Sequence, residues 1–152
     1  MEAFAITLEG LALAEWLRFS RWGYAAVNAT HLLGLCLLVG AMAALDLRLI
    51  GLWKTSSLDQ IYRVLSPVAA SGLGIAVVSG VVLFSVRATE YAELALFFVK
   101  LGLIAFGTAF VAVIHFRYDL ERISLKQQRL VGIFSLSIWL AALVSGRLLA
   151  FV

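Results

Sequence analysis

Residues 24–45 (YAAVNATHLLGLCLLVGAMAAL) decide the fold, because this stretch contains no Asp, Glu, Lys or Arg. An α-helix rises ~1.5 Å per residue, so the stretch is long enough to cross the ~30 Å hydrocarbon layer of a membrane. Three further stretches have similar length and composition, although Lys100 interrupts the third and Arg147 the fourth. The predicted spans are residues 24–45, 64–86, 94–116 and 130–152.

The composition of the whole chain agrees with a membrane protein. Of its 152 residues, 63% are hydrophobic and 14% are charged, whereas soluble domains have roughly 45–50% and about 25%. Mean hydropathy is +1.03. Helices are predicted for the spans, because lipid leaves backbone groups unsatisfied and no stretch alternates like a barrel strand. Short loops make consecutive helices antiparallel neighbours. We therefore expect an all-α integral membrane protein, a single-domain, up-down bundle of four transmembrane helices.

Residues 1–21 precede the first span and have a different character. Glu9 and Glu15 interrupt their apolar run, which makes them a poor transmembrane segment. Trp16 and Phe19 suit an interfacial helix that lies on the outer leaflet. A cleaved secretory signal is the alternative, but such a signal starts with positive charge and this stretch does not. We expect an N-terminal interfacial helix.

The basic residues predict the orientation of the bundle. Short loops with more Lys and Arg face the cytoplasm. The loops at 46–63 and 117–129 carry seven such residues, against three on the opposite side, so both termini are expected on the outer side. The seven are Arg48, Lys54, Arg63, Arg117, Arg122, Lys126 and Arg129; the three are Arg18, Arg21 and Arg87.

Polar groups at membrane depth are costly and mark candidate sites. In the outer half, His31 can ligate a metal or haem through one ring nitrogen. The alternative for His31 is a hydrogen bond between helices. Lys100, Arg147 and Arg21 lie in the same half, where they suit haem propionates, a quinone or another anionic amphiphile. For Lys100 and Arg147 the alternative is that the side chains extend to the membrane surface.

A second polar cluster is predicted near the inner surface, from Asp46, Arg48, His115 and Arg117. It is interpreted first as a charged collar that fixes helix ends, and second as an entry site for protons or ions. The two histidines differ in depth by about 20 Å at ~1.5 Å per residue, so they are not expected to share one haem within a subunit.

Motifs of soluble enzymes are missing from the sequence. It contains no glycine-rich phosphate loop, GxSxG or HExxH, and its single Cys excludes a disulfide framework. We therefore do not expect an enzyme on its own. The excess of basic over acidic residues in the chain is explained by the topology of the loops and by contact with anionic lipid. No nucleic-acid partner is therefore expected.

Three stretches carry a resemblance to a known family: HLLGLCLLVGAMAALDLRLIGLW at 31–53, SGLGIAVVSGVVLF at 71–84 and EYAELALFFVKLGLIAF at 90–106. The chain resembles a bacterial family of small four-helix inner-membrane proteins of unknown function, with matches at His31, Asp46 to Leu49 and Lys100. More distantly, the Ser-Gly of the second helix and the Tyr91 to Lys100 arrangement resemble the membrane domains of copper resistance D and cytochrome b proteins. The near resemblance implies the bacterial inner membrane and no particular activity, and the distant one implies haem or copper. With the orientation predicted from the basic residues, both termini are expected on the periplasmic side.

Three functions remain open at this point. The first is binding of b-type haem for electron transfer, with His31 as the metal ligand. The second is a noncatalytic accessory subunit in a larger membrane complex. The third is a small transporter for copper, protons or a small solute, which would use Asp46, His31 and His115 along a path. The expected partners are the lipid bilayer and either further copies of the chain or a larger complex.

Overall fold

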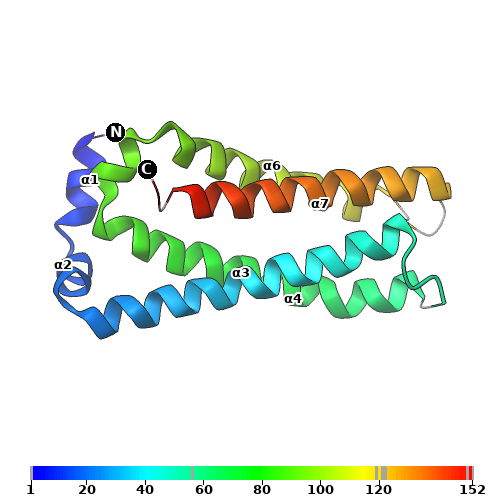
Figure 1. Cartoon of the computed structure of the whole chain (residues 1–152), viewed down its shortest axis with the longest axis horizontal. Coiled ribbons are helices and arrows are strands. Elements are labelled where there is room, and N and C mark those ends of the chain that lie inside the picture. The colour runs from blue at the N-terminus through cyan, green and yellow to red at the C-terminus, as the bar shows by residue number, and fades with distance from the viewer. Residues whose placement is uncertain (1, 56, 119, 121–122, 150, 152) are drawn as a thin grey trace.

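The computed structural model describes residues 2–55, 57–118, 120, 123–149 and 151. Met1, Arg122, Ala150 and Val152, which belong to the predicted segments, lie outside the described residues. The described part is helical, with four long helices that run side by side (Figure 1): α3 (Arg21–Ile50), α4 (Leu58–Val86), α6 (Ala95–Arg117) and α7 (Leu125–Leu148). All four are long and apolar enough to cross a membrane. The predicted all-α class is confirmed.

The helix boundaries follow from local capping. The side chains of Ser20, Ser57 and Ser124 each accept a hydrogen bond from a backbone N–H in the first turn of α3, α4 and α7, which satisfies a donor that the helix leaves free. α3 ends at Gly51, whose φ of +122° is a conformation that a residue with a side chain rarely adopts. α3, α4 and α7 begin three to six residues before their predicted spans, whereas both ends of α6 lie within one residue of the prediction.

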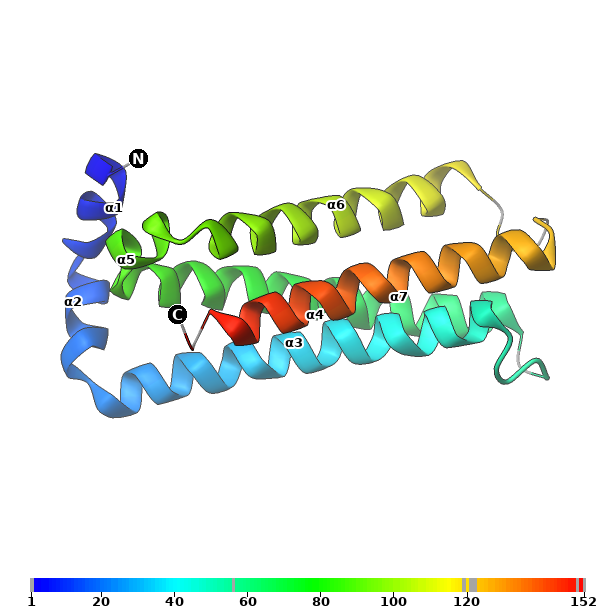
Figure 2. The same cartoon turned by 45° about the horizontal axis from the view of Figure 1, so that its top comes forward.

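Three short helices cover one end of the bundle, which we call the terminal end; the opposite end, with the loops after α3 and α6, is the loop end. α1 (Glu2–Glu9) and α2 (Ala12–Phe19) lie across the long helices (Figure 2), and α5 (Ala88–Glu93) connects α4 to α6. The sequence predicted one interfacial helix over 1–21. The helix instead breaks at Gly10 and Leu11, so that α1 and α2 are separate.

Two ionic groups fasten the short helices to the bundle. The Glu9 carboxylate accepts hydrogen bonds from the Thr89 amide and hydroxyl, at 2.8 and 2.7 Å. These bonds hold the pKa of Glu9 below its ordinary value, and the bond from the Thr89 amide has the largest effect. The Arg18 guanidinium donates to the Val86 carbonyl at 3.0 Å, where the end of a helix attracts positive charge. Ala14 and Leu17 of α2 are buried, whereas Phe19 remains exposed.

Close helix contacts occur where glycines face a neighbouring backbone. A Cβ atom on Gly72 of α4 would lie 2.5 Å from the Leu38 nitrogen of α3, and one on Gly132 of α7 would lie 2.7 Å from the Asp46 carbonyl oxygen of α3. Small residues permit such contacts in membrane bundles. The core formed beside them contains Leu38, Ala41, Met42, Leu45, Ala69 and Trp139.

The fourth long helix, α6, is attached on one side. Its buried residue is Gly107, which packs against Ile138 and Trp139 of α7. In the described part of the chain, no Cα atom of α4 lies within 8 Å of a Cα atom of α6. The bundle is therefore tightly packed between α3 and α4, α3 and α7, and α6 and α7, and it is loose between α4 and α6.

Candidate functional site

His31 of α3 is hydrogen-bonded to α4. Its Nδ1 lies 3.1 Å from the Ser79 hydroxyl oxygen, and that hydroxyl donates its own hydrogen to the Ile75 carbonyl. Because Ser79 has one hydrogen to donate, Nδ1 of His31 must be the donor in the first bond, which leaves Nε2 with its lone pair. Gly80 makes room for the ring, since a Cβ there would lie 3.1 Å from His31 Cε1.

The other outer-half candidates point to different places. The Lys100 ammonium lies over Gly146 of α7, 3.2 Å from where a Cβ would stand. Arg147 stacks on the Phe151 ring, with its guanidinium carbon 4.8 Å from the ring centroid. Arg21 is exposed at the start of α3. The structure therefore does not assemble these three residues and His31 around either of the two cavities described below.

The predicted loop-end cluster also separates. Asp46 and His115 line a common cavity between the helices. Arg48 lines a second, basic cavity beside the loop after α3, together with Lys54 and Arg129. Arg117 is exposed at the end of α6. The described side chains therefore do not form a collar of four charged residues. Asp46 faces the interior of the bundle, whereas Arg48 and Arg117 do not.

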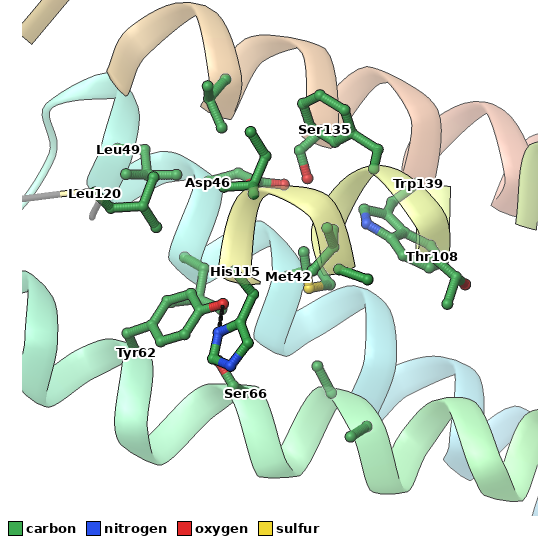
Figure 3. Close-up of a pocket in the computed structure, with 18 of the residues that line it drawn as sticks. Met42, Asp46, Leu49, Tyr62, Ser66, Thr108, His115, Leu120, Ser135 and Trp139 are labelled. Carbon is green, nitrogen blue, oxygen red and sulfur yellow. Dashed lines mark hydrogen bonds between the residues drawn. The ribbon is translucent and has the colours of Figure 1, made fainter. Parts of the chain in front are cut away.

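The cavity that contains Asp46 and His115 has a volume of about 270 Å³ and is enclosed by α3, α4, α6 and α7. Figure 3 shows its polar side chains among apolar ones. Met42 and Leu45 line it from α3, Leu73 from α4 and Val111 from α6. Its polar side chains are Asp46, Tyr62, Ser66, Thr108, His115 and Ser135, with the indole of Trp139.

Asp46 is the most unusual residue in this cavity. It is 2% exposed although it carries an ionisable group. Its side chain faces Ser135 of α7 (Figure 3), and among the described residues its Oδ2 atom has no hydrogen-bond partner. The Ser135 hydroxyl oxygen and the Trp139 indole nitrogen are likewise buried without a partner. Buried polar groups are almost always hydrogen-bonded, so three in one place point to a function.

The cavity lies next to the loose contact between α4 and α6. At the loop end, the Tyr62 hydroxyl lies 2.7 Å from His115 Nδ1, and the two rings stack with centroids 5.4 Å apart. At the terminal end, Phe84 and Phe97 stack with centroids 4.9 Å apart. We call the opening between these two aromatic pairs the lateral window. Ala70 lines the cavity and is exposed, so it lies at this opening.

The sequence did not single out Tyr62, Ser135 or Trp139 as site residues. A usable signal existed for two of them, because Ser135 and Trp139 are four residues apart and share one face of a helix. Nothing in the sequence links Tyr62 to His115.

The chain matches no family model, no curated protein and no solved structure. Among the described residues, no group of three or more His, Cys, Asp or Glu side chains is placed to hold a metal ion. The resemblance to the bacterial inner-membrane family and to the copper resistance D and cytochrome b domains therefore stays a prediction.

Proposed function

We propose that this membrane protein binds a small amphipathic molecule that reaches its cavity from within the membrane. The observation that carries the proposal is the Asp46 carboxyl, which is buried at an apolar cavity without a partner for Oδ2. Burying a carboxyl in this way is costly unless something compensates for it. A bound ligand that interacts with Asp46 supplies this compensation.

The lateral window supports access from the lipid. α4 and α6 are bridged at two places, by Tyr62 with His115 and by Phe84 with Phe97, and their backbones stay apart between them. α4 and α6 are not packed together between these two places. A molecule dissolved in the membrane can therefore pass between them, and no close helix contact has to separate. The apolar lining of the cavity favours such a molecule over an ion or a strongly polar solute.

The volume sets the size of the ligand. A cavity of about 270 Å³ filled at the ordinary protein packing density of about 0.74 holds on the order of a dozen non-hydrogen atoms. This corresponds to one substituted ring or a short chain with a polar head. A phospholipid is too large to fit as a whole.

The test measures how three labelled probes partition into nanodiscs with and without the protein. The probes are 4-butylphenol, 4-butylanisole and 4-butylbenzylamine. We expect at least one probe to bind in excess over empty nanodiscs, and Ala70→Trp to abolish the excess because it fills the lateral window. Val64→Trp is the matched control, since Val64 is 65% exposed on the same helix and does not line the cavity. The proposal fails if no probe shows binding that Ala70→Trp removes.

His31 supports a second candidate function, the binding of b-type haem. Its Nδ1 donates to Ser79, so Nε2 is the nitrogen that could ligate iron, and a ligating histidine commonly has its other nitrogen held in this way. Lys100 is the residue that could approach a propionate, because it lies near the start of α6, in the same half of the bundle as His31. When bound, haem would supply one-electron transfer.

The haem candidate is tested by the visible spectrum of protein expressed with haem supply. We expect a Soret band that His31→Ala removes and His115→Ala preserves. A spectrum without a Soret band, or one that His31→Ala leaves unchanged, rejects this candidate and does not affect the cavity proposal.

A further inference from the structure

Three unpartnered polar atoms converge on one wall of the cavity. They are Oδ2 of Asp46, the hydroxyl oxygen of Ser135 and the indole nitrogen of Trp139. Ser135 and Trp139 are one helical turn apart on α7 and share a face. Asp46 faces Ser135 from α3 (Figure 3), and the close contact of Gly132 with the Asp46 backbone holds the two helices together beside it.

The chemistry of these atoms restricts the head group of the ligand. The indole N–H is a donor only, the serine hydroxyl both donates and accepts, and the carboxyl accepts when ionised and can also donate when protonated. An ammonium group has donors alone, so it leaves the Trp139 N–H unsatisfied. An ether or carbonyl oxygen accepts alone, so it gives nothing to an ionised Asp46. A hydroxyl group has one donor and two acceptor lone pairs, which serves all three atoms in either protonation state of Asp46.

On the basis of the proposed function, we infer that the cavity selects neutral apolar molecules with a hydroxyl head, such as a phenol or a small alcohol. The hydroxyl is placed against Asp46, Ser135 and Trp139, and the apolar part lies among Met42 and the other aliphatic side chains of the cavity. The unpartnered atoms are thus the specificity element of the site, and the lateral window is its access route.

The test compares the three probes with the same nanodisc measurement. The phenol and the anisole differ by one methyl group that removes the hydroxyl donor, and the benzylamine carries a positive charge. We expect 4-butylphenol to bind roughly tenfold more tightly than 4-butylanisole, the ratio that about one hydrogen bond supports. Ser135→Ala and Trp139→Phe should each reduce phenol binding about fivefold, because each variant removes one group that donates a hydrogen bond to the oxygen of the probe.

Ser137→Ala is the matched control, because Ser137 lies on the same helix and its hydroxyl already donates to the Ile133 carbonyl. This variant should bind all probes as the original protein does, and circular dichroism should show the same helix content for every variant. If phenol and anisole bind equally, or if the benzylamine binds most tightly, the inference that the cavity selects a hydroxyl head is overturned. In either case binding that Ala70→Trp abolishes still supports the proposed function, so the two failures are distinguishable.

Discussion

The hydroxyl of Tyr62 lies 2.7 Å from Nδ1 of His115, and this contact joins α4 to α6 at the loop end of the cavity. The two rings are nearly parallel, with an interplanar angle of 12°. In the described part of the chain the backbones of these helices do not come within 8 Å of each other, as judged by their Cα atoms. The pair is therefore well placed to set the width of the lateral window.

Tyr62→Phe should loosen the contact between α4 and α6. The substitution keeps the ring and removes the hydroxyl, so it removes the hydrogen bond alone. We expect a loss of about 0.6 kcal/mol in the free energy of unfolding, the average for such a bond in a membrane bundle. Spin labels at the exposed residues Val64 and Val113 should give a broader distance distribution. Ser71→Ala is the control, because the Ser71 hydroxyl bonds within α4; equal broadening in both variants contradicts the prediction.

Gly72→Ala should destabilise the bundle, and Gly74→Ala should not. A Cβ on Gly72 would lie 2.5 Å from the Leu38 nitrogen, and backbone cannot move aside without separating α3 from α4. Overpacking of this kind costs about 1–3 kcal/mol. A Cβ on Gly74 meets nothing within 4 Å, and alanine is the better helix former. Thermal unfolding in one detergent measures both; similar transition temperatures would show that the helices do not cross at Gly72.

The attachment of α1 should weaken in acid. The hydrogen bonds from Thr89 lower the pKa of Glu9 below its ordinary value of 4.5. Since the folded form has the lower pKa, the contribution of this contact is complete above about pH 4.5 and is lost as the pH falls through the lowered value. The amide proton shift of Thr89, followed by NMR during an acid titration, should therefore show a midpoint below 4.5. Glu9→Gln should remove this transition, whereas Glu15→Gln on the exposed face of α2 should preserve it.

Depth along the membrane could be predicted from the sequence, because each residue adds a fixed rise to a helix. His31 contacts α4 at Ser79 and His115 contacts it at Tyr62, positions about 25 Å apart at ~1.5 Å per residue. The prediction that the two imidazoles lie at different heights therefore agrees with the structure. The existence of the four long helices followed from the same arithmetic.

The rotation of each helix could not be predicted. In a soluble helix the apolar stripe marks the buried face, but a membrane helix is apolar on its lipid face as well. Nothing in the sequence therefore showed that Asp46 faces Ser135, or that Trp139 belongs to the cavity and not to an aromatic belt. The contact of Glu9 with Thr89 was also hidden, since it joins segments far apart in the chain.

Lys100→Met should stabilise the fold. Lys100 lies inside α6, and among the described residues its ammonium group has no ion-pair partner. A cation within a transmembrane helix is costly, and its removal near the helix end should raise the free energy of unfolding by about 1 kcal/mol. Arg117→Met, at the exposed end of the same helix, should give no such gain. A destabilised Lys100→Met variant would show that the ammonium group has a partner in the membrane.

The same variant separates structural from functional roles of Lys100. Residues that reduce stability are commonly those that a protein needs for its activity. If Lys100 serves a ligand beside His31, Lys100→Met should weaken the Soret band of haem-supplied protein while it raises the temperature of unfolding. If Lys100 has no such role, its replacement should raise stability and leave both the spectrum and the binding of 4-butylphenol unchanged. The unfolding temperature measures stability, and the Soret band and phenol binding measure ligand binding. Because the two kinds of measurement are independent, each combination of results has one interpretation.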